Sequence, residues 1–274
     1  MAIKRSFGEK TFQVINVVIM LFLMFLAFYP FYYVVISSFS DSAQLLDRGL
    51  MIFPRGFNTE AYKAVFDNPS IFTGYRTTLI VVVVGTVVNV ISTAIGAFLV
   101  TRSGFAIRKV LSYLMIFTMY FSGGMIPTYL MVYKWLHLGD TLLALILPTA
   151  ISTYNLLIMK ANFEAIPASL EESAKLDGAN DIVILFRLIV PLSLPIIAVM
   201  ILFYGVGNWN SWFQALIYIR TRSKYPLQLI LREILLMNSA SSMTGGAQSG
   251  DQYMVAESIK YATIVVATLP ILFV

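Results

Sequence analysis

The sequence contains no cysteine, a single histidine and few charged residues. Without cysteine, disulfide bonds, thiolate nucleophiles and cysteine-ligated metals are excluded, and one histidine, His137, cannot form a histidine metal cluster. Charged residues make up 12% of the 274 residues, whereas about 25% is usual for a soluble domain. Hydrophobic residues make up 58%, and the mean hydropathy is +0.80. This composition indicates that lipid surrounds most of the chain.

Long apolar runs recur along the sequence. A helix rises about 1.5 Å per residue, so about 20 residues cross the hydrocarbon core of a membrane. We therefore expect an all-α integral membrane protein with six transmembrane helices, forming a single domain over residues 1–274. The last run has 16 residues before the sequence ends, so we expect a truncated last helix that lacks its exit tail. The six runs are Val14–Ile36, Thr78–Val100, Val110–Val132, Thr141–Met159, Leu188–Val206 and Ile259–Val274.

Basic residues in the short polar segments favour a cytoplasmic amino terminus. The first ten residues hold three basic side chains, and Thr101–Lys109 holds three with no acid, whereas Lys134–Asp140 on the other side has one lysine. Short cytoplasmic loops carry an excess of lysine and arginine. We therefore expect residues 160–187 on the cytoplasmic side and residues 207–258 as an extracytoplasmic segment.

The loop over residues 160–187 is the most polar stretch expected on the cytoplasmic side. Ser169 and Glu172 have the spacing of a capping box, and Gly178 can adopt the left-handed conformation that closes a helix. This pattern predicts a short helix over Leu170–Asp177, about 12 Å long.

A proline and a second polar turn bound this short helix. Pro167 is placed to end the preceding helix, and a second helix is expected to begin near Asn180. A short rigid helix at the mouth of a membrane bundle can dock a soluble partner and pass on its motion. A helix-turn-helix that only connects two spans fits the same pattern, because short motifs have many false positives.

The residues of this loop resemble a known motif. Glu172-Ser-Ala, three residues, Gly178, nine residues and then Leu-Ile-Val-Pro191 is similar to the EAA loop of ABC importer permeases. The family pattern is Glu-Ala-Ala, three residues, Gly, nine residues and Ile-x-Leu-Pro. Every spacing agrees, and the departures are mild in size: Ser for the first Ala, Leu for Ile and Val for Leu.

The wider resemblance is to the smaller permease of carbohydrate-uptake ABC importers, which include maltose, multiple-sugar and polysaccharide (LplC-like or alginate-type) systems. It covers essentially the whole chain and includes Ala165–Ala179, Trp209–Leu216 and the segment Tyr225-Pro-Leu-Gln. The resemblance implies the type I importer permease arrangement and ATP-driven import of an oligosaccharide or polysaccharide across the cell inner membrane. It implies no catalytic residue, cofactor or metal on this chain, with ATP and Mg²⁺ on a partner ATPase.

The resemblance also implies partners. These are a second homologous permease in a heterodimer, two ATPase subunits and an extracytoplasmic solute-binding protein. Residues 238–251, rich in Ser, Gly, Ala and Met, predict a mobile outer loop. In position they resemble the loop that reaches into the binding protein, although a loop without function has the same composition. The residues that map onto the ATPase-coupling helix are Leu170, Glu171, Glu172, Ser173, Ala174, Asp177 and Gly178.

Polar and aromatic residues within or beside the runs are candidates for the substrate path. Sugars are bound by aromatic faces together with amide and hydroxyl groups, and polar groups inside membranes turn toward the bundle interior. The same residue types also join helices to one another. In the family the main sugar site can lie mostly on the partner permease, so that this chain only lines the path. The candidates are Asn89, Tyr154, Asn155, Tyr204, Asn208, Trp209, Asn210, Trp212 and Gln214.

Three other classes compete with the importer. A secondary, ion-coupled transporter normally places ionisable residues within the membrane, and the apolar runs contain essentially none. An intramembrane enzyme needs a histidine pair, a cysteine or convergent carboxylates, which the runs lack. A structural membrane scaffold is opposed only by the EAA-like loop. The basic balance, with a pI of 9.3, favours an anionic saccharide weakly, because its charges lie largely in loops.

Overall fold

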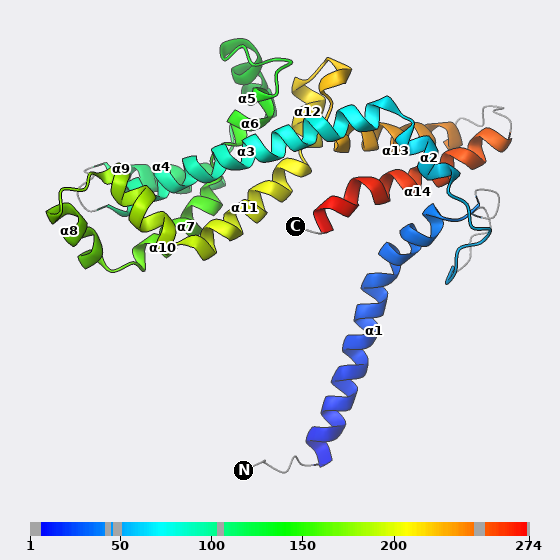
Figure 1. Ribbon diagram of the computed structural model, residues 1–274, viewed down its shortest axis with the longest axis horizontal. Coiled ribbons are helices and arrows are strands. Elements are labelled where there is room, and N and C mark those ends of the chain that lie inside the picture. Colours follow the sequence, from blue (N-terminus) through cyan, green and yellow to red (C-terminus); the bar gives the residue numbers. More distant parts are fainter. Residues whose placement is uncertain (1–6, 42–44, 46–50, 103–106, 244–249, 273–274) are drawn as a thin grey trace. The chain divides into compact units, whose positions relative to one another are not determined.

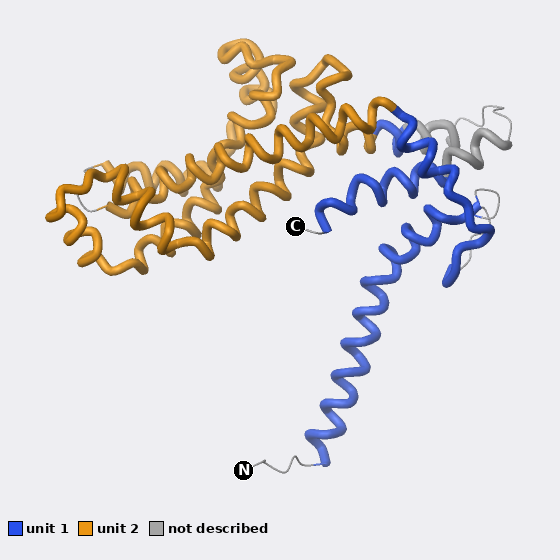
Figure 2. Tube along the Cα trace, in the orientation of Figure 1, with its two compact units in different colours: residues 1–68, 233–272 blue, residues 69–232, 273–274 orange. Residues whose placement is uncertain are grey.

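The computed structural model describes residues 7–41, 45, 51–102, 107–243 and 250–272. Throughout these residues the regular structure is helical, as the hydropathy predicts (Figure 1). The chain forms two compact units (Figure 2). Unit 1 is drawn from residues 1–68 and 233–272, and unit 2 from residues 69–232. The expectation that residues 1–274 form a single domain remains a prediction.

Unit 1 is built around two long helices. Helix α1 (Phe7–Ser38) packs against α14 (Gly250–Leu272), which also contacts α2 (Glu60–Phe66). The edge of the Tyr33 ring meets the ring of Tyr261 at a centroid distance of 6.0 Å. Apolar side chains of α1 before this region are exposed, which suits a helix surrounded by lipid.

Unit 2 is organised around α3 (Pro69–Thr101). This helix lies alongside α7 (Thr153–Glu164) and α11 (Leu194–Trp209), and the three share a continuous apolar core (Figure 1). The other helices of unit 2 are α4 (Arg108–Tyr120), α5 (Met125–Leu130), η2 (Met131–Trp135), α6 (Leu143–Ile146), η3 (Leu147–Thr149), α8 (Ala168–Leu176), α9 (Asp181–Val183), η4 (Ile184–Ile189), α10 (Val190–Leu192), α12 (Trp212–Tyr218) and η5 (Arg222–Lys224). Helix α13 (Leu227–Met243) begins in unit 2 and continues into unit 1.

The first two predicted spans lie within single long helices, α1 and α3, and the described part of the last one lies within α14. The other three are bent pairs. The helix direction bends by 116° at residues 121–124, by 53° at residues 150–152 and by 88° at Ser193. The sequence located these three apolar segments but did not predict the bends within them.

Local backbone chemistry explains where these bends fall. Gly124 has a φ of +88°, a conformation that glycine adopts far more readily than other residues. Pro191 and Pro195 flank Ser193, and each proline removes a backbone donor from the helical ladder. The hydropathy of these segments gave no sign of the bends.

Two expectations for the carboxyl-terminal part need correction. Helix α14 begins at Gly250, well before the predicted start at Ile259. Residues 238–243 belong to α13 and residues 250–251 to α14, so these parts of the predicted mobile loop are helical. Alanine and methionine are good helix formers and continue the helix begun by the leucine-rich start of α13. Residues 244–249 lie outside the described residues.

Candidate functional site

Helix α8 forms the short helix predicted in the polar loop. It ends at Leu176, and the Gly178 N–H donates to Lys175 O at 3.0 Å while the Ala179 N–H donates to Ala174 O at 2.9 Å. These two bonds form a Schellman motif. Gly178 has a φ of +83°, so the predicted left-handed closure is confirmed.

The predicted start of this helix is wrong. The residue preceding α8 is Pro167, and no side chain caps the helix there. Ser169 lies inside the first turn, so it does not form a capping box with Glu172. Proline has a fixed φ suited to entering a helix, which lets the helix begin at Ala168. The second predicted helix is confirmed, because the Asn180 side chain accepts a 2.9 Å bond from Val183 N at the start of α9.

Helix α8 presents two different faces. Glu171 is buried, and Ala174 is half-buried and packs against the apolar core of unit 2. On the other side Glu172 and Ser173 are exposed, and Leu176 is 89% exposed. Residues three and four apart share a helix face. One face is therefore fixed to the bundle while the other is free for contact. Of the remaining predicted coupling residues, Leu170, Asp177 and Gly178 are exposed.

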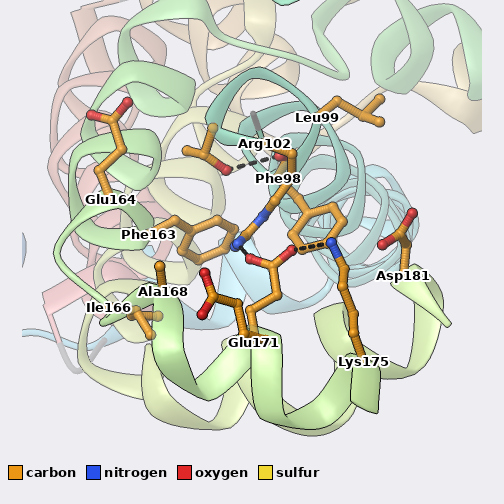
Figure 3. Close-up of a pocket in the computed structure, with 12 residues that line it drawn as sticks. Phe98, Leu99, Arg102, Phe163, Glu164, Ile166, Ala168, Glu171, Lys175 and Asp181 are labelled. Atoms are coloured by element: carbon orange, nitrogen blue, oxygen red, sulfur yellow. Dashed lines mark hydrogen bonds and ion pairs between the residues drawn. The ribbon is translucent and has the colours of Figure 1, made fainter. Parts of the chain in front are cut away.

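An ion pair joins α8 to the end of α3, and the sequence analysis did not identify it. Arg102, directly after α3, pairs with the Glu171 carboxylate, which also receives Lys175 Nζ at 2.9 Å (Figure 3). The Arg102 guanidinium lies 4.4 Å from the Phe98 ring centroid. Burial lowers the pKa of Arg102, and the negative charge of Asp181 opposes that change. A cavity of about 520 Å³ opens beside these side chains.

A second polar cluster lies inside unit 2, between α3, α7 and α11. The Asn208 amide donates to Asn89 Oδ1 at 3.0 Å and to Thr86 Oγ1 at 3.4 Å. Asn89 in turn donates to Thr149 O at 2.7 Å. A Cβ at Gly85 would lie 2.8 Å from Asn208 Nδ2. The glycine therefore gives the asparagine room to reach α3.

Tyr204 extends this cluster. Its hydroxyl lies 2.6 Å from Thr93 Oγ1 and accepts a 3.1 Å bond from Ser152 N. A pocket of about 250 Å³ lies beside it, with apolar walls and amide and hydroxyl groups but no charged side chain. Such groups can bind a hydroxyl-rich ligand. Among the described residues no set of three His, Cys, Asp or Glu side chains could hold a metal ion.

The structure brings together about half of the predicted path residues. Four of them line the pocket: Asn155, Tyr204, Asn208 and Gln214. Asn89 supports it from α3. The other four lie elsewhere: Tyr154 is 59% exposed, Asn210 bonds to Val206 O on its own helix, Trp209 packs on Tyr75, and Trp212 lies under Arg232.

Some lining residues were missed by the sequence analysis. Thr149, Ser152 and Ser211 all border the pocket. Thr149 and Ser152 flank the bend between η3 and α7. Pro148 beside them was the signal that could have pointed to an interrupted helix there.

A third polar site ties two loops of unit 2 together. The Asp140 carboxylate accepts bonds from Arg220 N at 3.0 Å and from Thr221 N at 2.9 Å. It also accepts from Thr221 Oγ1 at 2.6 Å and from Lys224 Nζ at 3.1 Å. These hydrogen bonds, those from Thr221 first, hold the pKa of Asp140 well below its usual range.

The long apolar helices, the bent spans and the neutral polar pocket define a multi-pass membrane permease. Residues 92–274 match the family of binding-protein-dependent transport system inner membrane components, and the chain belongs to that family.

Individual relatives agree with this assignment. Protein LplC of Bacillus subtilis (strain 168) is 42% identical over 265 residues, which is 97% of this chain and 89% of LplC. The polygalacturonan/rhamnogalacturonan transport system permease protein YtcP of the same organism is 41% identical over 247 residues, 88% of this chain and 84% of YtcP. A chain in the crystal structure of a bacterial ABC transporter involved in the import of the acidic polysaccharide alginate superimposes with a TM-score of 0.87. It is 28% identical, and the match covers 98% of this chain and 95% of that chain.

Membership in this family distinguishes between the functional classes that the sequence left open. The chain is an ABC importer permease with the type I fold and a component of a binding-protein-dependent system. These findings do not support the secondary-transporter alternative.

Proposed function

We propose that this permease moves an oligosaccharide or polysaccharide into the cell with energy from ATP hydrolysed by partner subunits. Two relatives support a saccharide: YtcP is named for polygalacturonan and rhamnogalacturonan, and the similar solved transporter imports alginate. Polygalacturonan and alginate are both acidic polysaccharides, so an acidic saccharide is the first candidate. ATP and Mg²⁺ bind to the ATPase partner and not to this chain.

The assembly we propose contains one copy of this chain, a second homologous permease, two ATPase subunits and an extracytoplasmic binding protein. The amino terminus lies in the cytoplasm, which places α8 on the side where ATP is available. Residues 207–258 then belong to the outer side. The basic residues of the first ten positions and of Thr101–Lys109 support this orientation.

The two-faced geometry of α8 carries the proposal. Its outer face presents Glu172, Ser173 and Leu176 to a partner, while Glu171 and Ala174 hold the inner face against unit 2. Leu176 on this outer face is 89% exposed. A partner that moves this helix therefore also moves the bundle behind it.

The neutral pocket beside Tyr204 is the part of the substrate path that we assign to this chain. Asn155, Asn208 and Gln214 offer both donors and acceptors to sugar hydroxyls. No positively charged side chain lines this pocket. We therefore assign it the binding of sugar hydroxyls and not the recognition of a negative charge on the saccharide. The partner permease contributes the opposite wall of the path.

The test is crosslinking from single cysteines on this naturally cysteine-free chain to a co-purified ATPase subunit. Ser173→Cys and Leu176→Cys are expected to crosslink in an ATP-dependent manner. Ala174→Cys, on the packed face of the same helix, is the matched control and is expected to react much less. If no ATPase co-purifies, or if the three positions react alike, α8 is not the docking element.

The substrate class needs a separate measurement. Proteoliposomes containing the complete complex and its binding protein are supplied with acidic oligogalacturonides, alginate oligomers or neutral maltooligosaccharides. We expect ATP-dependent uptake of an acidic oligosaccharide. Uptake of the neutral sugar alone would overturn the acidic assignment and leave the importer function standing.

A further inference from the structure

Arg102, at the end of α3, makes side-chain contacts that are not required to end a helix. Arg102 follows the last residue of α3 and is paired with Glu171 on α8. The two side chains are only 20% and 11% exposed. Buried and partly buried pairs are screened by solvent much less than exposed ones. This pair is therefore a stronger link than an ordinary surface ion pair.

The surroundings hold both partners in place. The Phe98 ring, one helical turn before Arg102, supports the guanidinium at 4.4 Å, which adds a cation–π attraction. Lys175 holds the same carboxylate at 2.9 Å from within α8. Figure 3 shows the Glu171 carboxylate between these two basic side chains, with Glu164 lying apart from them. The carboxylate is thus paired with a partly buried arginine from the end of α3 and with a more exposed lysine from its own helix.

Arg102 also has donors that are not used. Its Nε and one terminal nitrogen are buried without a hydrogen-bond partner among the described residues. A buried donor that lacks a partner is unfavourable. The neighbouring cavity is also bordered by Asp181, whose negative charge acts on Arg102. The unused donors of Arg102 therefore lie near a second carboxylate.

Helix α3 connects this pair with the polar pocket. Asn89, which supports Asn208, is thirteen residues before Arg102, a distance of about 20 Å along the helix. Between these two points Ala94, Ala97 and Phe98 of α3 belong to one apolar core with side chains of α7 and α11. A displacement applied at Arg102 therefore acts on the same rigid helix that supports the pocket.

We propose that Arg102 is a positioning residue for energy coupling: through Glu171 it fixes α8 to the inner end of α3, so that movement of α8 reaches the polar pocket. This inference rests on the proposed docking of an ATPase at α8. Arg102 itself contacts neither substrate nor ATP in this account. In this account it determines how many substrate molecules are transported for each ATP that is hydrolysed.

The test measures saccharide uptake and ATP hydrolysis together in proteoliposomes containing the complete complex and its binding protein. Arg102→Gln is expected to lower the number of substrates carried per ATP by about tenfold, the size expected for the loss of a charge-assisted hydrogen bond. Arg102→Lys keeps the charge and is expected to recover part of the ratio. The ATPase subunits should co-purify with every variant, because the outer face of α8 is unchanged.

Two further variants separate coupling from a merely structural role. Glu171→Gln, which keeps the shape of the side chain, should lower the ratio like Arg102→Gln, and the double variant should lose little more than either single one. Lys160→Gln removes the more exposed 3.5 Å pair with Glu164 and should leave the ratio unchanged. If Arg102→Gln does not assemble, Glu171→Gln carries the test.

The outcomes distinguish this inference from the proposed function. A wild-type ratio in both Arg102→Gln and Glu171→Gln would overturn the positioning role while leaving ATP-driven import intact. If the wild-type complex contains no ATPase or transports without ATP, the proposed function itself fails. Fully additive losses in the double variant would also contradict the inference, because they would show that the two residues act independently.

Discussion

Asn208 on α11 and Asn89 on α3 are joined by a 3.0 Å hydrogen bond although they lie 119 residues apart in the chain. Both side chains are buried. Helix α11 contributes residues to the pocket beside Tyr204, and α3 supports the pocket because Asn89 donates to the carbonyl of Thr149, which lines it. The bond therefore does two things at once. It holds two helices together, and it orients an amide that we assign to the substrate path.

The first prediction concerns this bond. Asn89→Ala removes the acceptor for Asn208 and the donor to Thr149 O, and each such interhelical bond contributes about 0.6 kcal/mol, with a maximum of about 1.7. We expect a fall of about 1–2 kcal/mol in the free energy of unfolding, seen as a lower thermal unfolding temperature in detergent. Asn210→Ala, at an exposed site whose side chain bonds to Val206 O on its own helix, is the control and should change stability by less than about 0.5 kcal/mol. Equal effects of the two variants would show that the Asn89 contacts do not stabilise the bundle.

The second prediction concerns the glycine behind the same asparagine. In Gly85→Ala the new Cβ would lie 2.8 Å from Asn208 Nδ2, so the amide must move away from α3. Overpacking of this kind destabilises by about 1–3 kcal/mol, and we expect both a lower unfolding temperature and slower uptake. Gly205→Ala is the matched control, because its Cβ would meet Thr86 Oγ1 at an ordinary 3.8 Å. Both variants gain the same helix propensity. If they behave alike, the close approach at Gly85 has no importance.

Some of this architecture could be predicted because its causes are local. Gly178 and Asn180 bond to groups within a few residues of themselves, so the ends of α8 and α9 follow from residue type and spacing. The apolar runs likewise locate the spans, because hydropathy depends only on neighbouring residues. Ser169 shows the limit of this approach: its spacing fits a capping box, yet Pro167 starts the helix earlier.

The remaining features depend on partners distant in sequence. Arg102 and Glu171 are separated by 69 positions, and nothing near either residue identifies the other. Trp209 and Trp212 have the composition of a sugar site, but they pack on Tyr75 and Arg232 instead. Which polar residues face the pocket is set by how α3, α7 and α11 pack. A single sequence therefore predicted the kinds of residues in the path better than their positions.

The third prediction concerns the turn after α8. A Cβ at Gly178 would meet nothing within 4 Å, but the φ of +83° is unfavourable for other residues. The effect of substitution is therefore conformational and not steric. A left-handed conformation is unfavourable by about 1–2 kcal/mol for most L-residues, and asparagine tolerates it best. We expect uptake rates to fall in the order Gly178→Asn, Gly178→Ala, Gly178→Val, with membrane insertion unchanged. Wild-type uptake in Gly178→Val would show that the conformation of this turn does not matter for coupling.

The fourth prediction concerns the exposed face of α8. Glu172→Lys reverses a charge at the proposed ATPase contact without disturbing the buried Glu171 beside it. We propose that a basic ATPase surface faces the wild-type carboxylate. The reversed charge would then meet a like charge, which can be unfavourable by several kcal/mol at an interface, so we expect at least a tenfold loss of uptake and weaker co-purification of the ATPase. Lys63→Glu, on the exposed surface of α2, is a charge-reversal control away from this contact and should leave ATPase binding unchanged. Equal ATPase recovery with both variants would remove Glu172 from the interface.

The last prediction concerns Asp140, which accepts two backbone and two side-chain hydrogen bonds from residues 220–224. These bonds favour the carboxylate, so its pKa is lower in the folded protein than in the unfolded chain, where about 4 is usual. A group with a lowered folded pKa stabilises the protein above its unfolded pKa and loses that contribution as the pH falls through the folded pKa. Asp140→Asn does not titrate and cannot form the charged bond with Lys224.

The pH dependence then follows from the sign of this shift. The difference in unfolding temperature between the wild type and Asp140→Asn should stay constant from pH 8 to about pH 5 and shrink below about pH 4. Thermal unfolding in detergent over this range measures it directly. Asn210→Ala, at an exposed site where no carboxylate is removed, is the control and should show no such narrowing. A difference that widens at low pH, or that is absent at pH 7, would contradict the view that the Asp140 carboxylate holds the two loops together.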